Sequence, residues 1–364
     1  MVLARLAGGS LVKGLVLAGG TGSRLRPITY SGSKQLIPVA NKPILFYGLE
    51  ALAAAGIEDV GMIVGDTEQE IKGAVADGSR WSLHVHYIRQ EAPLGLAHAV
   101  LAAQEYLGED DFVMYLGDNL VRDGITQFVR AFEERQPDAQ IFLARVPEPE
   151  RFGVAVLEGD RVTRLVEKPR ESISDLALSG VYMFGSVIFQ AASSINPSWR
   201  GELEITDAIQ YLLDRGYTVR AEQITGWWKD TGKVEDLLEA NHIMLEEQAR
   251  RVEGLVDEGS HLVGSVVVED GAEVTDSVIR GPAVIGHNTL VIRSTLGPYV
   301  SVSEDSRIED SEISDSIIMG GASISEVRRM TDSLIGTNVR VCKDDQHPTT
   351  FQFVIGDSSQ VRIP

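Results

Sequence analysis

Residues 13–226 alternate short apolar runs with stretches of helical periodicity. The apolar runs predict buried strands at 14–18, 60–64, 84–90, 112–116 and 139–146. The stretches between them carry apolar residues at helical spacing and predict helices at 43–56, 68–78, 96–108 and 125–136. This order of elements predicts an α/β, Rossmann-like domain with a mostly parallel sheet and helices on both faces.

The chain changes character after a long helix predicted at Val234–Val252. From Leu262 on, isolated aliphatic residues recur every five or six positions, separated by Gly, Asp, Ser, Asn and Glu. These aliphatic positions are Val268, Val274, Ile279, Ile285, Val291, Leu296, Val302, Ile308, Ile313, Ile318 and Ile324. Such a short repeat is typical of a parallel β-helix, in which each coil stacks on its neighbours. An antiparallel sandwich of short strands is the alternative interpretation.

These patterns divide the chain into four parts. Residues 1–12 read as an N-terminal extension, because they lack the apolar core and cleavage site of a secretory signal. Residues 13–252 are expected to form the α/β domain, and residues 253–345 the β-helix. Residues 346–364 are expected to be a C-terminal tail.

Composition narrows the possible partners and the compartment. The formal net charge of −20 argues against nucleic acid and anionic membrane surfaces as partners. No apolar run reaches the roughly 18 residues that a membrane span needs. The single cysteine, Cys342, excludes an intrachain disulfide and fits a reducing cytoplasm. No histidine has metal-ligand spacing, and we interpret His84 and His86 as structural or surface residues.

A glycine-rich loop follows the first predicted strand. Gly19, Gly20 and Gly22 let the backbone approach a triphosphate and point N–H groups at it. The loop lacks the GxxxxGK[ST] pattern, so it is not a Walker A loop. Arg24 and Lys34 flank it, which suits charge build-up on two different phosphoryl groups.

Two aspartates occupy positions suited to a metal ion. Asp118 ends a predicted strand in YLGDN, and Asp230 follows two tryptophans in GWWKDTG. Each could instead cap a turn. Together with a triphosphate, however, two aspartates can share a Mg²⁺ ion, which prefers oxygen ligands and would orient the reacting phosphates.

Further charged residues suit a sugar phosphate. Glu167 and Lys168 precede a proline in EKP, where the lysine could clamp a monophosphate while the carboxylate takes sugar hydroxyls. A solvated ion pair is the alternative. The segment RGELEITDAI looks like a capped helix start and could also bring Glu202 to a sugar.

Together these motifs resemble the sugar-1-phosphate nucleotidyltransferases. The similarity runs from about Lys13 to about Gly232 and is highly specific as a set. Its motifs are LAGGTGSRLRP, SKQLIPVANKP, QEAPLGLAHA, LGDN, RFGVAV, EKP, SGVYMF, RGELEITDAI and WWKDTG. Within the family, the chain looks most like the long members that transfer a thymidylyl group to glucose 1-phosphate. Their C-terminal domain is a left-handed β-helix.

The resemblance implies a role for each matching residue. The nucleotide-binding set is Leu17, Gly19, Gly20, Gly22, Ser23, Gln35, Gln90 and Gly95. The sugar-phosphate set is Gly153, Glu167, Lys168 and Leu178, to which the RGELE segment adds Glu202. The catalytic set is Arg24, Lys34, Asp118 and Lys168. Asp118 and Asp230 would hold Mg²⁺, Arg24 would stabilise the departing pyrophosphate, and Gln90 and Gly95 would read the pyrimidine edge.

The implied reaction is in-line attack by the phosphate of α-D-glucose 1-phosphate on the α-phosphorus of dTTP. It gives dTDP-glucose and pyrophosphate for deoxysugar biosynthesis. Because a phosphate anion is already a competent nucleophile, the protein supplies only positioning and charge. A homo-oligomer is expected, because β-helices commonly pack side by side.

Several alternatives stay open. UTP is one alternative to dTTP, because uracil differs from thymine by one methyl group, worth only about 1–3 kcal/mol in an apolar pocket. Phe152, Lys229 and Leu178 replace the tyrosine, leucine and valine of the short members, which leaves the sugar choice open. A silent regulatory subunit would lack the loop arginine, the lysine or a metal aspartate, and all are present. An acyl-transferring β-helix would need a histidine base, for which His261 and His287 are the candidates.

Overall fold

The computed structural model of the protein describes residues 12–343 and 357–362. The predicted N-terminal extension and most of the predicted tail lie outside these residues. The chain forms two compact units. Of the described residues, the first unit holds residues 12–21 together with Leu45–Asp230. The second unit holds Gly22–Ile44 together with the chain from Thr231 onward, so a segment of the glycine-rich region packs with the C-terminal part.

A nine-stranded sheet forms the centre of the first unit. Its strands, in spatial order, are β5 (His84–Arg89), β4 (Asp59–Val64), β1 (Lys13–Leu17), β6 (Phe112–Leu116), β11 (Leu176–Phe184), β8 (Ala139–Arg145), β12 (Val219–Gln223), β10 (Arg161–Glu167) and β9 (Gly153–Glu158). The first four strands are parallel, as are β8 and β12. The remaining pairs are antiparallel.

The α/β prediction is therefore confirmed, but the sheet is mixed rather than mostly parallel. The five predicted strands all form, and their parallel half is β5, β4, β1 and β6. The antiparallel pairs come from β9, β10 and β11, which the sequence interpretation did not assign. β11 is buried at all nine positions, so it lacks the alternation that would mark a half-exposed strand. A two-residue turn at Gly159-Asp160 joins β9 to β10. A short turn of this kind that contains glycine is a sequence signal for a β-hairpin.

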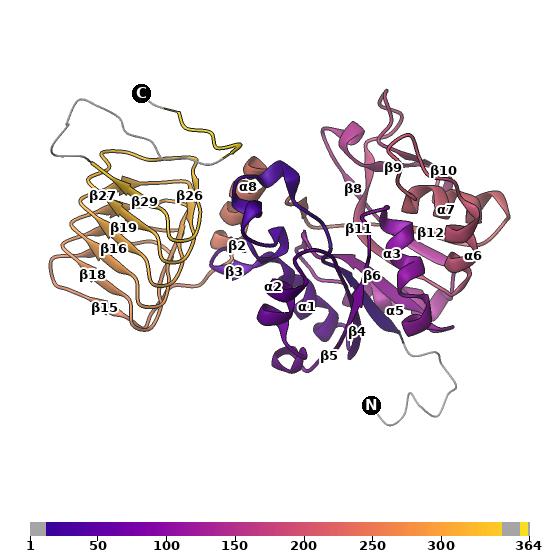
Figure 1. The fold of residues 1–364 in the computed structure, drawn as a ribbon, viewed down its shortest axis with the longest axis horizontal. Helices are drawn as coiled ribbons and strands as arrows, with labels where there is room; N and C mark the ends of the chain where they lie inside the picture. Colours follow the sequence, from indigo (N-terminus) through magenta and orange to yellow (C-terminus); the bar gives the residue numbers. More distant parts are fainter. Residues whose placement is uncertain (1–11, 344–356, 363–364) are drawn as a thin grey trace. The chain divides into compact units, whose positions relative to one another are not determined.

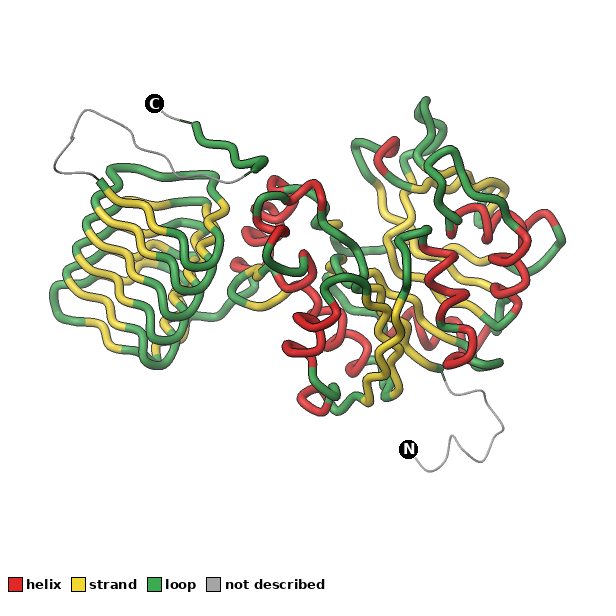
Figure 2. The backbone as a smooth tube through the Cα atoms, in the orientation of Figure 1, coloured by secondary structure: helices red, strands yellow, loops and turns green. Residues whose placement is uncertain are grey.

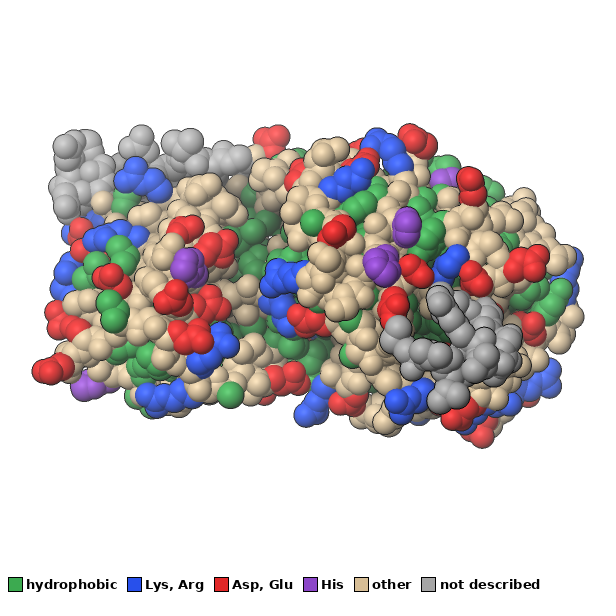
Figure 3. Space-filling model, turned by 90° about the horizontal axis from the view of Figure 1, so that it is seen from below, with side chains coloured by type: hydrophobic (Ala, Val, Ile, Leu, Met, Phe, Trp, Pro, Cys, Tyr) green, Lys and Arg blue, Asp and Glu red, His purple; other side chains and the backbone are tan. Residues whose placement is uncertain are grey.

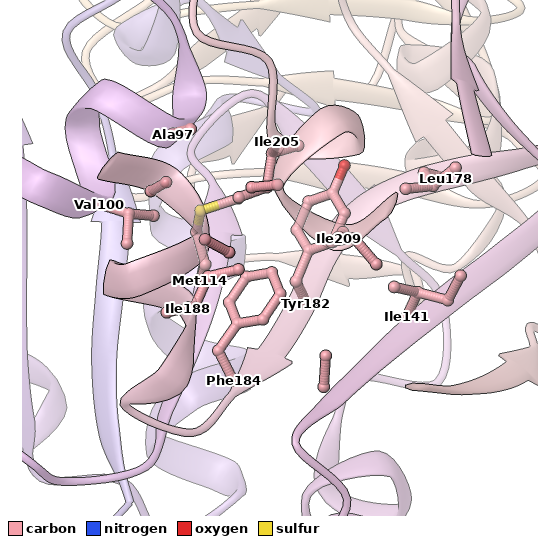
Figure 4. Close-up of a cluster of buried hydrophobic side chains, with 14 of the residues drawn as sticks. Ala97, Val100, Met114, Ile141, Leu178, Tyr182, Phe184, Ile188, Ile205 and Ile209 are labelled. Atoms are coloured by element: carbon pink, nitrogen blue, oxygen red, sulfur yellow. The ribbon is translucent and has the colours of Figure 1, made fainter. Parts of the chain in front are cut away.

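Helices cover both faces of the sheet (Figure 1). They are α1 (Ile44–Ala54), α2 (Glu68–Val75), α3 (Leu96–Ala102), α4 (Gln104–Leu107), α5 (Thr126–Arg135), α6 (Val187–Ser194) and α7 (Ile205–Asp214). On one face, α3, α6 and α7 bury Ala97, Ile188 and Ile205 in a cluster with Met114 of β6 (Figure 4). On the other face, the ring of Tyr115 packs against Gly48 of α1. This two-sided burial explains the continuous apolar strands.

Short elements complete the part of the chain before residue 250. A small antiparallel pair joins β7 (Asn119–Val121) to β13 (Trp228–Asp230). In the second unit, a tight hairpin joins β2 (Pro38–Val39) to β3 (Lys42–Pro43). Helix α8 (Val234–Glu246) ends before the predicted Val252. The last predicted residues instead form β14 (Arg251–Val252), because they pair in parallel with Val267–Val268.

From Arg251 to Cys342 the chain winds through three parallel sheets, and we call residues 251–343 the solenoid (Figure 2). The first sheet holds β14 (Arg251–Val252), β17 (Val266–Val268), β20 (Ala283–Ile285), β23 (Val300–Val302), β26 (Ser316–Ile318) and β28 (Leu334–Ile335). The second holds β15 (Leu255–Val256), β18 (Glu273–Thr275), β21 (Leu290–Ile292), β24 (Arg307–Glu309), β27 (Ser323–Ser325) and β29 (Arg340–Cys342). The third holds β16 (His261–Val263), β19 (Val278–Arg280), β22 (Thr295–Leu296) and β25 (Glu312–Ile313).

The predicted aliphatic repeat forms the core of this solenoid. Each of the eleven predicted positions is at most 1% exposed. Residues one coil apart pair in parallel, as Val274 does with Val291 and Val291 with Ile308. This pairing excludes the antiparallel sandwich.

Polar residues of the repeat also have a structural task. The hydroxyl of Ser277 accepts a hydrogen bond from the backbone N–H of Ser294, one coil on, at 3.0 Å. Ser294 does the same for Ser311 at 3.1 Å. Each hydroxyl also donates to a carbonyl two residues earlier in its own coil, so buried polar groups at the corners are paired.

The described surface carries charges of both signs. On the face drawn in Figure 3, basic side chains are interspersed with acidic ones. His84 and His86 lie exposed on β5, as expected for surface residues. Among the described residues, none of the helices combines the length and the apolar character that crossing a bilayer requires.

Candidate active site

The carboxyl ends of β1 and β6 lie side by side in the first unit. The carbonyl of Leu17 accepts a hydrogen bond from the N–H of Gly117 at 3.0 Å. The structure thereby brings Leu17, Gly19 and Asp118 to one edge of the parallel half of the sheet. Ligands of such sheets bind beyond the carboxyl ends of the strands.

The small β7–β13 pair brings the two predicted metal aspartates together. Asp230 of β13 is paired directly with Asn119 of β7, and Asp118 precedes Asn119. Asp118 is buried, with only 7% of the residue exposed. Because Asp118 and Asp230 lie at neighbouring positions on two bonded segments, one ion could reach both.

Asn119 is a site residue that the sequence interpretation missed. Its Nδ2 donates to Oδ1 of Asp118 at 3.1 Å, and its Oδ1 accepts from Nε1 of Trp228 at 2.6 Å. Its backbone carbonyl accepts from the hydroxyl of Tyr115 at 3.1 Å. Burial, and then the charge of Asp118, raise the pKa of Tyr115, so this hydroxyl keeps its proton. The position of Asn119 beside Asp118 in LGDN was the available signal.

The donor set fits a magnesium ion that is shared with a substrate. Carboxylate oxygens are the ligands that Mg²⁺ prefers, and Mg²⁺ is commonly held by one or two carboxylates plus substrate phosphates. Within residues 12–343 and 357–362, no group of three or more His, Cys, Asp or Glu residues could hold a metal by itself. The two aspartates would therefore hold the ion together with phosphate oxygens and water.

A second cluster gathers most of the predicted sugar-phosphate residues. Gly153 and Glu167 are paired across β9 and β10. A Cβ at Gly153 would lie 2.5 Å from Cγ2 of Thr206, 2.9 Å from Oε2 of Glu167 and 3.7 Å from Cδ1 of Leu178. Glycine is required here because three side chains from separate elements converge on one point.

Two cations lie beside the Glu167 carboxylate in this cluster. Nζ of Lys168 is 3.7 Å from Oε1 of Glu167, and a guanidinium nitrogen of Arg200 is 3.5 Å from the same oxygen. Arg200 also contacts Glu202 at 2.8 Å and the buried Glu204 at 3.3 Å. Arg200 was missed by the sequence interpretation, although it opens the RGELE segment. Through Arg200 the structure brings Glu202 to the cluster.

The charge balance of this cluster is tuned by burial. Burial, and then the nearby charge of Glu204, raise the pKa of Glu167. Lys168, a 3.2 Å hydrogen bond from the Thr206 hydroxyl and Arg200 oppose that rise. A carboxylate that is buried and also flanked by cations suits the recognition of sugar hydroxyls beside a phosphate.

An aromatic contact connects the sugar-phosphate cluster to the metal aspartates. The rings of Phe152 and Trp228 meet edge to face with centroids 5.2 Å apart. Trp228 is in turn held by Asn119. Phe152, one of the departures from the short members, thus has a packing partner that needs no hydroxyl.

The two residues predicted to read the pyrimidine are in direct contact. Nε2 of Gln90 lies 3.2 Å from the carbonyl of Gly95 and 2.9 Å from Nδ1 of His98. These contacts fix the Gln90 carboxamide at the start of α3, where His98 was not predicted.

Of the other predicted nucleotide residues, Gly20 lies exposed in the first unit, and Gly22, Ser23 and Gln35 lie in the second unit, as do the predicted catalytic residues Arg24 and Lys34. Gly22 has φ +60°, and a Cβ there would lie 2.8 Å from Thr29 and 2.9 Å from Cβ of Lys34. Gln35 is buried and accepts a hydrogen bond from the Ser33 hydroxyl at 2.6 Å. Arg24 and Ser23 are exposed on a short 3₁₀ turn. The structure brings Gly22 and Lys34 together, while the convergence of the whole nucleotide set stays a prediction.

Comparison with known proteins decides the family. The model of the nucleotidyl transferase family matches residues 13–247. The chain belongs to this family. The matched range contains all the predicted site residues, from Leu17 to Asp230, and the chain is an enzyme of the nucleotidyltransferase type.

Similarity to individual members of the family extends beyond that range. The chain is 56% identical over 353 residues to a glucose-1-phosphate thymidylyltransferase of Streptomyces griseus, covering 97% of this chain and 99% of that protein. It is 54% identical over 354 residues to the enzyme of the same name from Streptomyces antibioticus, with the same coverage of both chains. A crystal structure of UDP-glucose pyrophosphorylase with UDP-glucose matches 65% of this chain and 100% of its own, with a TM-score of 0.59 and 26% identity.

Proposed function

We propose that this protein transfers a thymidylyl group from dTTP to α-D-glucose 1-phosphate, giving dTDP-glucose and pyrophosphate. The observation that carries the proposal is the near full-length identity of 54–56% to two enzymes named for that activity. The arrangement of the paired aspartates and of the Glu167 cluster fits this reaction. Deoxysugar biosynthesis is the process this product would supply.

The residues of the first unit divide into two tasks. Asp118 and Asp230 would hold Mg²⁺, with Asn119 keeping the Asp118 carboxylate in place. Lys168 would bind the phosphate of the sugar substrate, and Arg200 is added for the same task. Glu167 would accept hydroxyls of the sugar, within a pocket walled by Gly153 and Leu178.

The loop residues supply the other half of the chemistry. Gly19, Gly20, Gly22 and Ser23 would bind the triphosphate through backbone N–H groups and a hydroxyl. Arg24 would stabilise the departing pyrophosphate, and Lys34 would contact the phosphates. Gln35, Gln90, Gly95 and Leu17 would form the nucleoside pocket.

The chemistry needs no protein nucleophile. The sugar phosphate oxygen attacks the α-phosphorus in line, and pyrophosphate leaves from the opposite side. Magnesium, when bound, offsets the charge of the two substrates. The side chains of this protein orient the reactants, exclude water and place positive charge where it develops.

UTP is the second candidate nucleotide. It is supported by the similarity to a UDP-glucose pyrophosphorylase. It is also supported by the small binding free energy that the methyl group of thymine contributes in an apolar pocket, about 1–3 kcal/mol. Another sugar 1-phosphate is the second candidate acceptor, because Phe152, Lys229 and Leu178 differ from the short members.

Initial rates of pyrophosphate release with glucose 1-phosphate and Mg²⁺, comparing dTTP with UTP, test the proposal. A higher kcat/KM for dTTP is the expected result. A preference for UTP would keep the reaction class and change the product. Release with neither nucleotide would favour another sugar phosphate or a silent regulatory subunit.

The remaining predictions concern the whole molecule. We propose that the solenoid is the left-handed β-helix of the long family members, supported by its short coils and three parallel sheets. The domain division at residue 252, the homo-oligomer and the cytoplasmic location stay predictions. Two observations argue against an acyl-transferring solenoid. His261 and His287 are both exposed, and the His287 ring hydrogen-bonds to the backbone carbonyl of Asp270.

A further inference from the structure

The loop that carries Arg24 and Lys34 is bound to the solenoid inside the second unit. Gly22–Ile44 contains three short 3₁₀ turns and the β2–β3 hairpin, and no α-helix of its own before Ile44. Such a segment has few internal hydrogen bonds to fix its shape, so its conformation depends on what it packs against. Its packing partners are α8 and the coils around Val302 and Gly336.

Asn41, at the tip of the hairpin, binds a solenoid coil with both ends of its carboxamide. Its Nδ2 donates to the carbonyl of Val302 at 2.7 Å, and its Oδ1 accepts from the hydroxyl of Ser303 at 3.3 Å. The residue has φ +61°, a left-handed conformation that asparagine tolerates better than most residues. The hairpin tip is thus shaped to present this side chain to the coil.

Asn241 of α8 holds the neighbouring residue of the same turn. Its Oδ1 accepts from the backbone N–H of Ala40 at 2.8 Å and from the hydroxyl of Ser301 at 3.0 Å. The Ala40 N–H can only donate, which fixes the orientation of the Asn241 carboxamide. Asn241 and Ser301 are both fully buried. One buried oxygen therefore joins the loop, the helix and the solenoid.

The chemistry of Asn241 indicates positioning rather than stability. Its Nδ2 is buried, and among the described residues it has no hydrogen-bond partner. A buried donor without an acceptor costs free energy of folding. An apolar residue would avoid that cost but would leave the Ala40 N–H unpaired, so the asparagine is best explained by the geometry it imposes on the loop.

Two further contacts hold the same loop. Ala40 packs in an apolar cluster with Leu245, Val267 and Val284. Nearer the start of the loop, the side chain of Ile28 lies against the coil at Gly336, where a Cβ would come 3.2 Å from Cδ1 of Ile28. The loop is thus held at two separate levels of the solenoid.

We propose that the solenoid and α8 position the phosphate-binding loop for nucleotidyl transfer, with Asn41 and Asn241 as the positioning residues. The role of the loop in catalysis rests on the proposed function, whereas its attachment rests on the contacts above. Displacing charged groups by about 1 Å can cost roughly a hundredfold in rate, so an anchored loop matters for turnover. The solenoid then has a task in the reaction besides any role in assembly.

Hydrogen exchange on the full chain tests the attachment directly. The variants are Asn41→Gly, Asn241→Leu and, as a matched control, Asn288→Gly. Glycine adopts positive φ without strain, so Asn41→Gly removes the side chain and keeps the turn. Asn288 also has a positive φ (+55°). Its side chain donates one hydrogen bond to Asp305, which belongs to the solenoid and not to the loop. We expect peptides from residues 22–44 to exchange at least about tenfold faster in the first two variants only.

Kinetics test the consequence for the reaction. We expect kcat to fall about tenfold or more in Asn41→Gly and Asn241→Leu, with KM for the sugar phosphate changed less than about twofold. Asn241→Asp keeps an acceptor for the Ala40 N–H and should recover much of the lost rate. If Asn241→Leu does not fold, Asn41→Gly carries the test.

The possible failures are distinguishable. Unchanged exchange in residues 22–44 of both variants would overturn the attachment. Faster exchange with wild-type turnover would overturn the positioning role. A wild-type protein that transfers no nucleotide would reject the proposed function, while the exchange data would still decide the attachment.

Discussion

Asn119 donates a hydrogen bond to Oδ1 of Asp118 at 3.1 Å, in the same segment where β7 pairs with β13. The other end of the Asn119 carboxamide accepts from Trp228, whose ring meets that of Phe152. One amide therefore connects a proposed metal ligand to the wall of the sugar-phosphate cluster. It joins two segments that are 109 residues apart in sequence, and it gives a physical reason to expect the proposed metal and sugar groups to work as one site.

Asn119→Ala should lower both turnover and stability. The Asp118 carboxylate would lose its donor, and the Trp228 N–H would lose its acceptor, so we expect kcat to fall about tenfold to a hundredfold. Losing a partner for a buried group costs about 1–3 kcal/mol of unfolding free energy. Steady-state rates and urea unfolding measure the two effects. Trp228→Phe, which keeps the Asn119–Asp118 bond, should reduce kcat less; the opposite order would reject the role of that bond.

Asp118→Asn should abolish most of the activity while leaving the fold intact. An amide is a weaker magnesium ligand than a carboxylate, and the ion supplies several kcal/mol of charge stabilisation, so kcat should fall at least about a hundredfold. Rates at saturating Mg²⁺ and circular dichroism check this. Asp123→Asn, at an exposed position of the same region, is the matched control. Equal turnover in Asp118→Asn would exclude the metal assignment.

Gly153→Ala should weaken binding of the sugar phosphate. The added methyl group would meet Thr206 at 2.5 Å and the Glu167 carboxylate at 2.9 Å. Overpacking of this kind costs about 1–3 kcal/mol, so KM for glucose 1-phosphate should rise about fivefold or more. Gly73→Ala is the control, because open space surrounds Gly73 in α2 and alanine favours a helix. An unchanged KM in Gly153→Ala would place the sugar phosphate elsewhere.

The raised pKa of Glu167 predicts a pH dependence of stability. Its pKa in the folded protein lies above the ordinary value of 4.5, so between those two values the native state binds more protons than the unfolded state. Stability from this group is therefore present below pH 4.5 and is lost as the pH rises through the folded pKa.

Glu167→Gln should remove this component. Urea midpoints followed by tryptophan fluorescence from about pH 4 to 7 should fall more steeply with pH in the wild type than in the variant. Parallel curves for the two proteins would show that the pKa of Glu167 is not raised. The neighbouring Asp207, whose pKa burial also raises, stays in both proteins and cancels in the comparison.

Local sequence patterns predicted a large part of the architecture. Helical spacing located α1, α2 and α5. It predicted α3 and α4 as one helix, because the break between them at Ala103 is only a distortion of the last turn of α3. The aliphatic repeat located the solenoid core residue by residue, because each coil buries its own aliphatic side chain independently of distant segments. Motif spacing also singled out the proposed metal and sugar-phosphate residues, among them Asp118 at the end of a predicted strand and Glu167 just before Lys168-Pro169.

Non-local contacts decided the rest. The antiparallel direction of β11 and the early end of α8 depend on which backbone edge is available for pairing, which no local pattern records. The roles of Asn119 and Arg200 appear only when segments far apart in sequence fold together.

The amino-acid sequence by itself determined the family, the reaction class and the types of residue at the site, because those depend on local chemistry and spacing. Only the tertiary structure decided that Asn41 and Asn241 bind the loop at Gly22–Ile44 to α8 and the solenoid. The physical reason is that an asparagine is locally indistinguishable from any other polar turn or helix residue. Its function follows from the particular backbone N–H and carbonyl groups that folding brings within hydrogen-bonding distance.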